Sequence, residues 1–162
     1  MADIQTAFRF TLGLIGVILS VYTLYVEFQS AHDRSYKALC DINEHVSCSK
    51  VFLSKYGRGF GLVEKIFGPD SVLNLPNPIF GIVFYGSVMV LCLFRFSLKV
   101  LGLLTLLSAA SCLMSIYLAY ILYFMKDICV VCVSTYVVNF LLLFLNFQRY
   151  NEISNVQKLK EE

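Results

Sequence analysis

Four stretches of this chain contain no Asp, Glu, Lys or Arg, and each is about as long as a bilayer is thick. They are residues 10–26, 71–94, 100–125 and 128–148. A helix needs about 20 mostly apolar residues to cross a bilayer, so the last three qualify directly. The first has 17 uncharged residues, and the flanking Arg9 and Glu27 extend it if their charged ends snorkel to the interface. With 58% apolar residues and a mean hydropathy of +0.72, the composition favours a membrane protein over a soluble domain.

These stretches predict an all-α membrane protein, a four-transmembrane-helix bundle. The expected spans are approximately 9–27, 78–95, 100–124 and 128–148. The first stretch has the alternative of a secretory signal peptide, but residues 21–27 show no small-residue cleavage site, so a retained helix is favoured. Because the loop 28–77 is the only extended polar segment, we expect residues 1–162 to form a single integral membrane domain.

The number of spans predicts which segments share a side of the membrane. If all four helices cross, the loop 28–77 and residues 126–127 lie on one side, and both termini lie on the other. Lys and Arg near the spans number seven on the loop side and six on the other, so the positive-inside rule does not decide the orientation. Clustered cysteines suit an oxidising compartment. We therefore expect a luminal loop and cytosolic termini in the endoplasmic reticulum membrane, or a periplasmic loop in a bacterial source.

A Cys-x-x-Cys pair, Cys129 and Cys132, opens the last uncharged stretch. A spacing of three places both sulfurs on one helical face within disulfide reach, and a helix N-terminus favours a thiolate. The alternative is two packing cysteines that happen to be three apart. No metal site is expected, because zinc needs two more ligands and His32 and His45 lack ligand spacing.

The polar loop contains a second pair, Cys40 and Cys48. It is either a structural disulfide or a shuttle that exchanges electrons with the first pair through a mixed disulfide. A shuttle requires one loop cysteine to reach one helix cysteine. Cys48 is the candidate, because it lies closer in sequence to the membrane-proximal Phe52.

Polar side chains continue the helical face that begins at Cys132. Tyr136 and Asn139 follow at spacings of four and three. They either satisfy one another and neighbouring helices or bind a ligand that has carbonyl groups. Asn77, between two prolines, is a second candidate donor. Candidate aromatic walls, each of which alone is more often core, are Phe52, Phe60, Phe80, Phe84 and Tyr85.

The loop between the cysteines and the second stretch has two further features. Gly57, Gly59 and Gly61 permit unusual backbone angles or close approach. Residues 62–67 are apolar at 62, 63, 66 and 67, which predicts a short amphipathic helix. Such a helix either lies flat in the membrane interface or caps the bundle.

The chain resembles the vitamin K epoxide reductase family, in its vertebrate-type branch or the closely similar paralogue. The matching stretches are Ala38-Leu-Cys40-Asp, Ser47-Cys48-Ser, Gly57-Arg-Gly-Phe-Gly-Leu62, Asn77-Pro-Ile-Phe-Gly81, Tyr117-Leu-Ala-Tyr-Ile-Leu122, and Cys129-Val-Val-Cys132 followed by Tyr136. The resemblance implies a four-helix bundle in the endoplasmic reticulum membrane with a luminal cap. It also implies reduction of vitamin K 2,3-epoxide to the quinone, and of the quinone to the hydroquinone.

The same resemblance assigns roles to residues of this chain. Cys132 attacks the substrate, Cys129 is its partner, Cys48 exchanges with Cys129, and Cys40 faces the external reductant. Asn77 and Tyr136 match hydrogen-bond donors to the substrate, and Phe52 and Phe80 match walls of the pocket. No cofactor is expected to be permanently bound, since vitamin K is the substrate and protein dithiols are the reductant. Implied partners are luminal thioredoxin-like oxidoreductases, 4-hydroxycoumarin anticoagulants and membrane lipid, but no nucleic acid.

Two other functions stay open at this point. The same residues suit a disulfide-generating thiol oxidase that passes electrons to a membrane quinone. A non-enzymatic four-span scaffold with two structural disulfides is the other alternative. The chain also departs from the family pattern: Tyr56 stands where members often have Trp, and Pro76 and Pro78 flank Asn77. A helix N-terminus, moreover, favours a thiolate at Cys129 rather than at Cys132.

Overall fold

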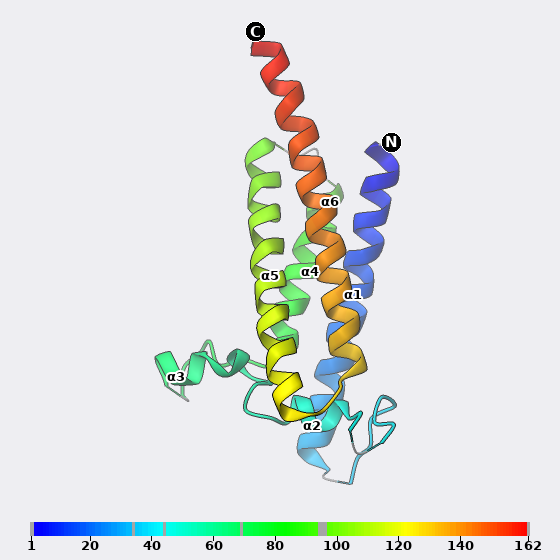
Figure 1. The fold of residues 1–162 in the computed structure, drawn as a ribbon, viewed down its shortest axis with the longest axis vertical. Helices are drawn as coiled ribbons and strands as arrows, with labels where there is room; N and C mark the ends of the chain where they lie inside the picture. Colours follow the sequence, from blue (N-terminus) through cyan, green and yellow to red (C-terminus); the bar gives the residue numbers. More distant parts are fainter. Residues whose placement is uncertain (1, 34, 44, 69, 94–96, 162) are drawn as a thin grey trace.

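The computed structural model describes residues 2–33, 35–43, 45–68, 70–93 and 97–161, and over these ranges the protein is all-helical (Figure 1). The described residues form isolated bridges but no β-strand. The predicted all-α class is confirmed. It follows from the composition, because an apolar segment in lipid must satisfy every backbone N–H and C=O internally, as a helix does.

Within the described residues, three helices are long and apolar enough to cross a membrane: α1 (Ala2–His32), α5 (Leu98–Met125) and α6 (Val130–Glu161). They coincide with the first, third and fourth predicted spans. The second predicted span falls on α4 (Asn77–Leu93), an apolar helix of 17 residues. Positions 94 and 95 of that span lie outside the described residues. The crossing of the membrane by all four helices stays a prediction.

Helix α6 continues well past the uncharged stretch that predicted it. The stretch ends at residue 148, whereas the helix runs to Glu161. Residues 149–161 contain neither Gly nor Pro, so nothing in the backbone ends the helix where the apolar residues end. Its polar part is tied to α1, because Gln5 donates a hydrogen bond to Glu152 (3.1 Å), which also pairs with Arg149 (3.0 Å).

Arg9 and Glu27, which were expected to snorkel outward, are buried instead, with 1% and 6% of their surface exposed. The Arg9 guanidinium donates to the Gln5 carbonyl (3.4 Å) and to the Thr6 hydroxyl (3.3 Å). The Glu27 carboxylate pairs with Arg58 of the loop at 3.4 Å. Polar partners inside the protein replace the interfacial water that snorkelling would have provided.

The long helices form a bundle in which α1 packs against α4 and α6, and α5 packs against α6. Both chain ends lie at one end of this bundle, and the loop with α2 lies at the other (Figure 1). Large apolar side chains point outward along the helices, with more than half of their surface exposed; examples are Ile18, Leu106, Leu113 and Phe140. Apolar surface on this scale is typical of helices that face lipid.

Hydrogen bonds between polar side chains join the helices in the middle of the bundle. The Tyr85 hydroxyl of α4 donates to Asn139 of α6 (2.7 Å), whose amide donates to Ser115 of α5 (2.9 Å). Asn146 donates to Ser108 in the same way (2.9 Å). Such hydrogen bonds stabilise helix association in lipid, where apolar packing alone does not distinguish a neighbouring helix from an acyl chain.

The described part of the loop contains three short elements: α2 (Cys48–Phe52), the 3-10 turn η1 (Gly59–Gly61) and α3 (Val63–Phe67). Helix α2 packs against α1. Helix α3 is the predicted short amphipathic helix, but it projects away from the bundle (Figure 1), and its Ile66 and Phe67 are exposed. The structure does not support capping of the bundle by α3. The other predicted position, flat in the membrane interface, fits its exposed apolar face.

Candidate active site

A short backbone contact aligns the cysteine loop with the beginning of α6. The Ile128 amide donates to the His45 carbonyl (2.7 Å), and the Ser47 amide donates to the Ile128 carbonyl (3.1 Å). Ser47 precedes Cys48, and Ile128 precedes Cys129. This register therefore places the two cysteines side by side.

The sulfurs of Cys48 and Cys129 are 3.6 Å apart, and both residues are fully buried. Cys48 also forms a disulfide with Cys40, whereas Cys129 and Cys132 are free thiols. A thiol in contact with a disulfide sulfur is the arrangement from which thiol–disulfide exchange begins. Cys40 is partly exposed, so it is the more accessible sulfur of the loop disulfide.

The Asp41 carboxylate holds both sides of the loop disulfide. It accepts hydrogen bonds from the Ala38 amide (2.9 Å), the Ser47 hydroxyl (3.0 Å), and the amide (3.1 Å) and hydroxyl of Ser49. Partial burial raises the pKa of Asp41, but the hydrogen bonds from Ser49, Ala38 and Ser47 outweigh it and hold the pKa below its ordinary value. Asp41 is therefore a carboxylate at neutral pH, and it fixes the loop around Cys48.

Cys129 immediately precedes α6, and its sulfur takes the part of an N-cap side chain. It accepts a hydrogen bond from the Cys132 amide (3.2 Å) in the first turn. Hydrogen bonding from the Cys132 thiol lowers the pKa of Cys129. Burial acts in the opposite direction, and the amides of Cys132 and Val131 add to the lowering. Of the two thiols, Cys129 is therefore the more readily ionised, as the helix N-terminus predicts.

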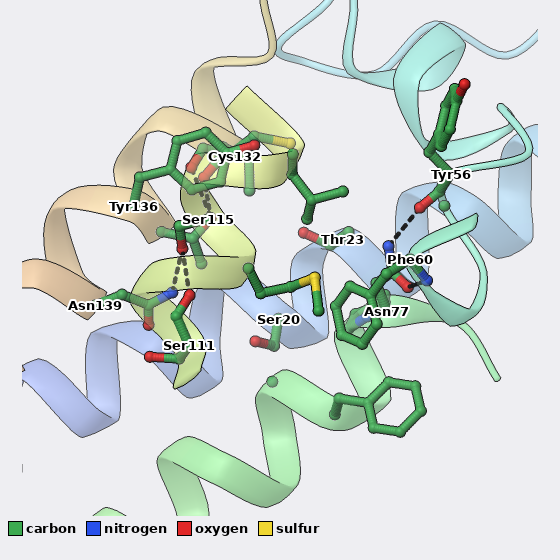
Figure 2. A pocket seen from close by; sticks show the side chains of 18 of the residues that line it. Ser20, Thr23, Tyr56, Phe60, Asn77, Ser111, Ser115, Cys132, Tyr136 and Asn139 are labelled. Carbon is green, nitrogen blue, oxygen red and sulfur yellow. Dashed lines mark hydrogen bonds between the residues drawn. The ribbon is translucent and has the colours of Figure 1, made fainter. Parts of the chain in front are cut away.

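A cavity of about 450 Å³ opens beside these thiols, between α1, α2, α4, α5 and α6 (Figure 2). Its size is within the range of small-molecule sites, and its walls are mostly apolar with a few polar groups. The residues predicted for the site that line it are Phe52, Phe60, Asn77, Phe80, Phe84, Tyr85, Cys132, Tyr136 and Asn139. Of the four cysteines in the two pairs, only Cys132 is among the lining residues.

Asn77, at the start of α4, ties one wall of the cavity together. Its side-chain carbonyl accepts from the Phe60 amide (2.8 Å), and its amide group donates to the Tyr56 carbonyl (2.6 Å; Figure 2). An amide group has two N–H donors, so one stays available for a ligand. The flanking prolines do not prevent this geometry, since Pro78 lies in the first helical turn, where its missing N–H has no helical acceptor.

The glycine-rich segment before α3 turns in a way that few side chains permit. Gly59, Phe60 and Gly61 have positive φ angles of 50°, 58° and 67°. The predicted unusual backbone angles are confirmed at Gly59 and Gly61, whereas the left-handed conformation of Phe60 was not predicted. This turn places the Phe60 ring against Phe80, with 5.3 Å between ring centroids, and completes an aromatic wall.

Gly57, the first glycine of this segment, lies in close contact with the backbone of α2. A Cβ atom on Gly57 would lie 2.1 Å from the Phe52 carbonyl oxygen, so the chain can pass α2 only without a side chain. The Tyr56 ring lies directly over Gly61, where a Cβ would be 2.5 Å away. Tyr56 thus packs on the turn.

The hydroxyl group of Tyr136 is buried and has no hydrogen-bond partner among the described residues. Tyr136 and Cys132 lie close together at one end of the cavity (Figure 2). Buried hydroxyl groups are almost always hydrogen-bonded. The unpaired phenol therefore has a hydrogen bond free for a ligand oxygen at this end of the cavity.

Sequence reasoning missed functional positions on α1. Ser20, Thr23 and Glu27 line the cavity, and Tyr22 contacts the Cys40 sulfur at 3.8 Å. Ser20, Thr23 and Glu27 are separated by three and four residues, which is the spacing of one helical face. That polar stripe within an apolar stretch was the available signal for an inward-facing side of the first span.

Comparison with known proteins places these features in a family. A sequence model of the vitamin K epoxide reductase family matches residues 7–147. Vitamin K epoxide reductase complex subunit 1 from Mus musculus is 48% identical over 147 residues, which cover 89% of this chain and 89% of the mouse protein. The Rattus norvegicus protein of the same name is 46% identical over 147 residues, again with 89% of each chain covered.

Proposed function

Because the chain belongs to the vitamin K epoxide reductase family, we propose that it reduces vitamin K 2,3-epoxide to the quinone and the quinone to the hydroquinone. Membership makes it an oxidoreductase of the vitamin K epoxide reductase type. The observation that carries the specific proposal is the contact between the sulfurs of Cys48 and Cys129, 3.6 Å apart, beside a cavity lined by Cys132 and Tyr136.

The epoxide reaction begins with the Cys132 sulfur, since it is the one that lines the cavity. Cys132 attacks a ring carbon as a thiolate after its proton passes to Cys129, to which its thiol donates a hydrogen bond. A carbon–sulfur bond forms and a carbon–oxygen bond breaks, which leaves an alkoxide. Tyr136 and Asn77 donate hydrogen bonds to the oxygen as its charge develops, in the manner of an oxyanion hole.

The second step releases the quinone. Cys129 passes the proton it received from Cys132 to the alkoxide, which becomes a hydroxyl group. Cys129, again a thiolate, attacks the Cys132 sulfur, so that a disulfide forms and the carbon–sulfur bond breaks. The electron pair left on carbon forms the quinone double bond and expels the neighbouring hydroxyl group, which takes up one proton from solvent and leaves as water. One thiol, one thiolate, one solvent proton and one epoxide thus become one disulfide, one quinone and one water.

The loop pair then reduces the Cys129–Cys132 disulfide. With both loop cysteines reduced, Cys48 attacks Cys129, and Cys40 resolves the mixed disulfide. Electrons enter at Cys40 from a luminal thioredoxin-like oxidoreductase, because Cys40 is the more exposed loop sulfur. The reduced pair can reduce a quinone in the same way, by transfer of two electrons and two protons.

We also propose that the protein lies in the endoplasmic reticulum membrane as a four-span bundle, with the loop luminal and both termini cytosolic. We propose that 4-hydroxycoumarin anticoagulants bind in the same cavity as vitamin K.

The test is turnover of vitamin K 2,3-epoxide by the full chain in lipid nanodiscs with a dithiol, followed by chromatography of the quinone. Wild-type protein is expected to convert the epoxide. Tyr136→Phe is expected to raise the Kd of the epoxide and of a 4-hydroxycoumarin by about tenfold, since it removes one hydrogen bond to the ligand.

The matched control is Tyr120→Phe, which removes an exposed phenol on α5 that does not line the cavity. It is expected to leave both affinities unchanged. Unaltered binding in Tyr136→Phe would remove Tyr136 from the ligand site. If the wild-type protein left the epoxide intact while it oxidised thiol substrates and reduced a quinone, the proposed direction of electron flow would be wrong.

A further inference from the structure

The two sulfurs of the loop disulfide have different surroundings. Cys48 is fully buried and faces Cys129, whereas Cys40 is partly exposed and faces α1. The Tyr22 hydroxyl of α1 lies 3.8 Å from the Cys40 sulfur. Because a disulfide sulfur has no proton, the phenol is the donor of this hydrogen bond.

Packing holds the phenol in this position. Tyr22 and Cys40 pack on the same buried cluster, which includes Val26 of α1 and Ala38 of the loop. Tyr22 is half-buried and is not among the residues that line the substrate cavity. A change at its hydroxyl therefore acts on the loop sulfur without removing a contact with the quinone.

Other titratable groups share these surroundings. They are Tyr36 and Asp41 on the loop, Tyr25 on α1, and Cys129 and Cys132 at the start of α6. For none of the residues in this set does the structure record a hydrogen bond to the Cys40 side chain. Among the described residues, Tyr22 is the side chain recorded as a donor to this sulfur.

We propose that Tyr22 is a catalytic residue of the electron relay, whose hydroxyl stabilises the Cys40 thiolate when the loop pair exchanges with the Cys129–Cys132 pair. The proposal rests on the exchange step of the proposed function. It adds a donor on α1 that acts on a reacting sulfur outside the substrate cavity.

The step balances in atoms and electrons. The Cys40 thiolate attacks Cys48 in the Cys48–Cys129 mixed disulfide. The Cys40–Cys48 bond forms, the Cys48–Cys129 bond breaks, and the electron pair of the broken bond leaves on Cys129. Cys40 and Cys48 are thereby oxidised, and the active-site pair is reduced.

Each end of this relay has a hydrogen-bond donor. Charge starts on Cys40, where Tyr22 donates, and ends on Cys129, where the Cys132 amide donates at 3.2 Å. Hydrogen bonds to an ionised acceptor are about twice as strong as those to a neutral one. The Tyr22 hydroxyl therefore stabilises the Cys40 thiolate more than the Cys40 thiol or disulfide. The same contact assists the reverse step, in which Cys40 is the leaving group.

The experiment measures the reactivity of Cys40 against pH in the reduced chain, residues 1–162, in nanodiscs. A short pulse of iodoacetamide is followed by mass spectrometry of the peptide that contains Cys40. Tyr22→Phe keeps the ring and removes the hydroxyl. It is expected to raise the pH of half-maximal alkylation by about one unit, which corresponds to about tenfold slower alkylation at neutral pH, with the same rate at high pH.

Tyr25→Phe is the matched control, because it removes a phenol one turn further along α1. It is expected to leave the midpoint in place. A midpoint in Tyr22→Phe that equals that of the wild type would overturn the proposal, and so would a variant that changed only the rate at high pH, which reports access to Cys40. The assay contains no quinone, so its outcome is independent of epoxide turnover by the wild-type protein.

Discussion

Cys132→Ser is expected to abolish epoxide reduction while the helices and the cavity stay intact. Of the four cysteines in the two pairs, Cys132 is the one that lines the cavity. A serine hydroxyl is a far weaker nucleophile than a cysteine thiolate near neutral pH. We expect the rate of quinone formation to fall by at least about a thousandfold, as for loss of a nucleophile in other enzymes. Binding of a 4-hydroxycoumarin should persist, because Tyr136 and Asn77 are unchanged.

The control for this variant is Cys112→Ser. Cys112 is a free thiol in α5 that does not line the cavity, so its replacement should leave turnover within about twofold of the wild type. Turnover by Cys132→Ser at a comparable rate would show that another sulfur attacks the substrate.

Gly57→Ala is expected to disrupt the loop that closes the cavity. A Cβ at this position would meet the Phe52 carbonyl oxygen at 2.1 Å and the Ser54 carbonyl oxygen at 3.2 Å. Both contacts are backbone atoms that cannot rotate away. The Gly57 carbonyl also accepts from the backbone amide of Asn77 (2.9 Å), so any shift also moves the residue that we propose as a ligand donor. We expect a loss of about 1–3 kcal/mol in stability and at least a tenfold loss of turnover, from thermal unfolding and the epoxide assay.

Gly86→Ala makes the same chemical change within α4, where a Cβ would meet nothing within 4 Å. Alanine favours the helical state over glycine by about 0.5–1 kcal/mol, so this variant should be as stable as the wild type or slightly more stable. Equal behaviour of the two variants would show that the close approach at Gly57 does not constrain the loop.

Much of the fold was predictable because each uncharged stretch is close to the length of a span. Charge marks where a helix leaves the lipid, but it does not end the helix. For that reason α6 runs thirteen residues beyond residue 148, and its end at Glu161 was missed. The burial of Arg9 and Glu27 was missed for a related reason: their partners come from tertiary or local polar contacts that hydropathy does not encode.

The candidate site was predictable where a short spacing fixes geometry. The Cys129–Cys132 pair and the stripe through Tyr136 depend only on helical periodicity. The contact of Cys48 with Cys129 depends instead on the hydrogen bonds that join His45 and Ser47 to Ile128, residues far apart in the chain. The left-handed Phe60 and the Tyr22 contact likewise require the folded loop, so no local pattern indicates them.

The most direct test of the central claim is a crosslink between the two cysteine pairs. In a Cys40→Ser, Cys132→Ser protein, Cys48 and Cys129 have lost their usual partners and are the only active-site thiols left. Mild oxidation in nanodiscs, followed by mass spectrometry of the non-reduced protein, should reveal a Cys48–Cys129 disulfide in nearly all molecules, since the two sulfurs are 3.6 Å apart in the folded protein. If both thiols stay open to alkylation in folded protein after this treatment, the pairs do not meet, and electrons cannot pass from the loop to the cavity.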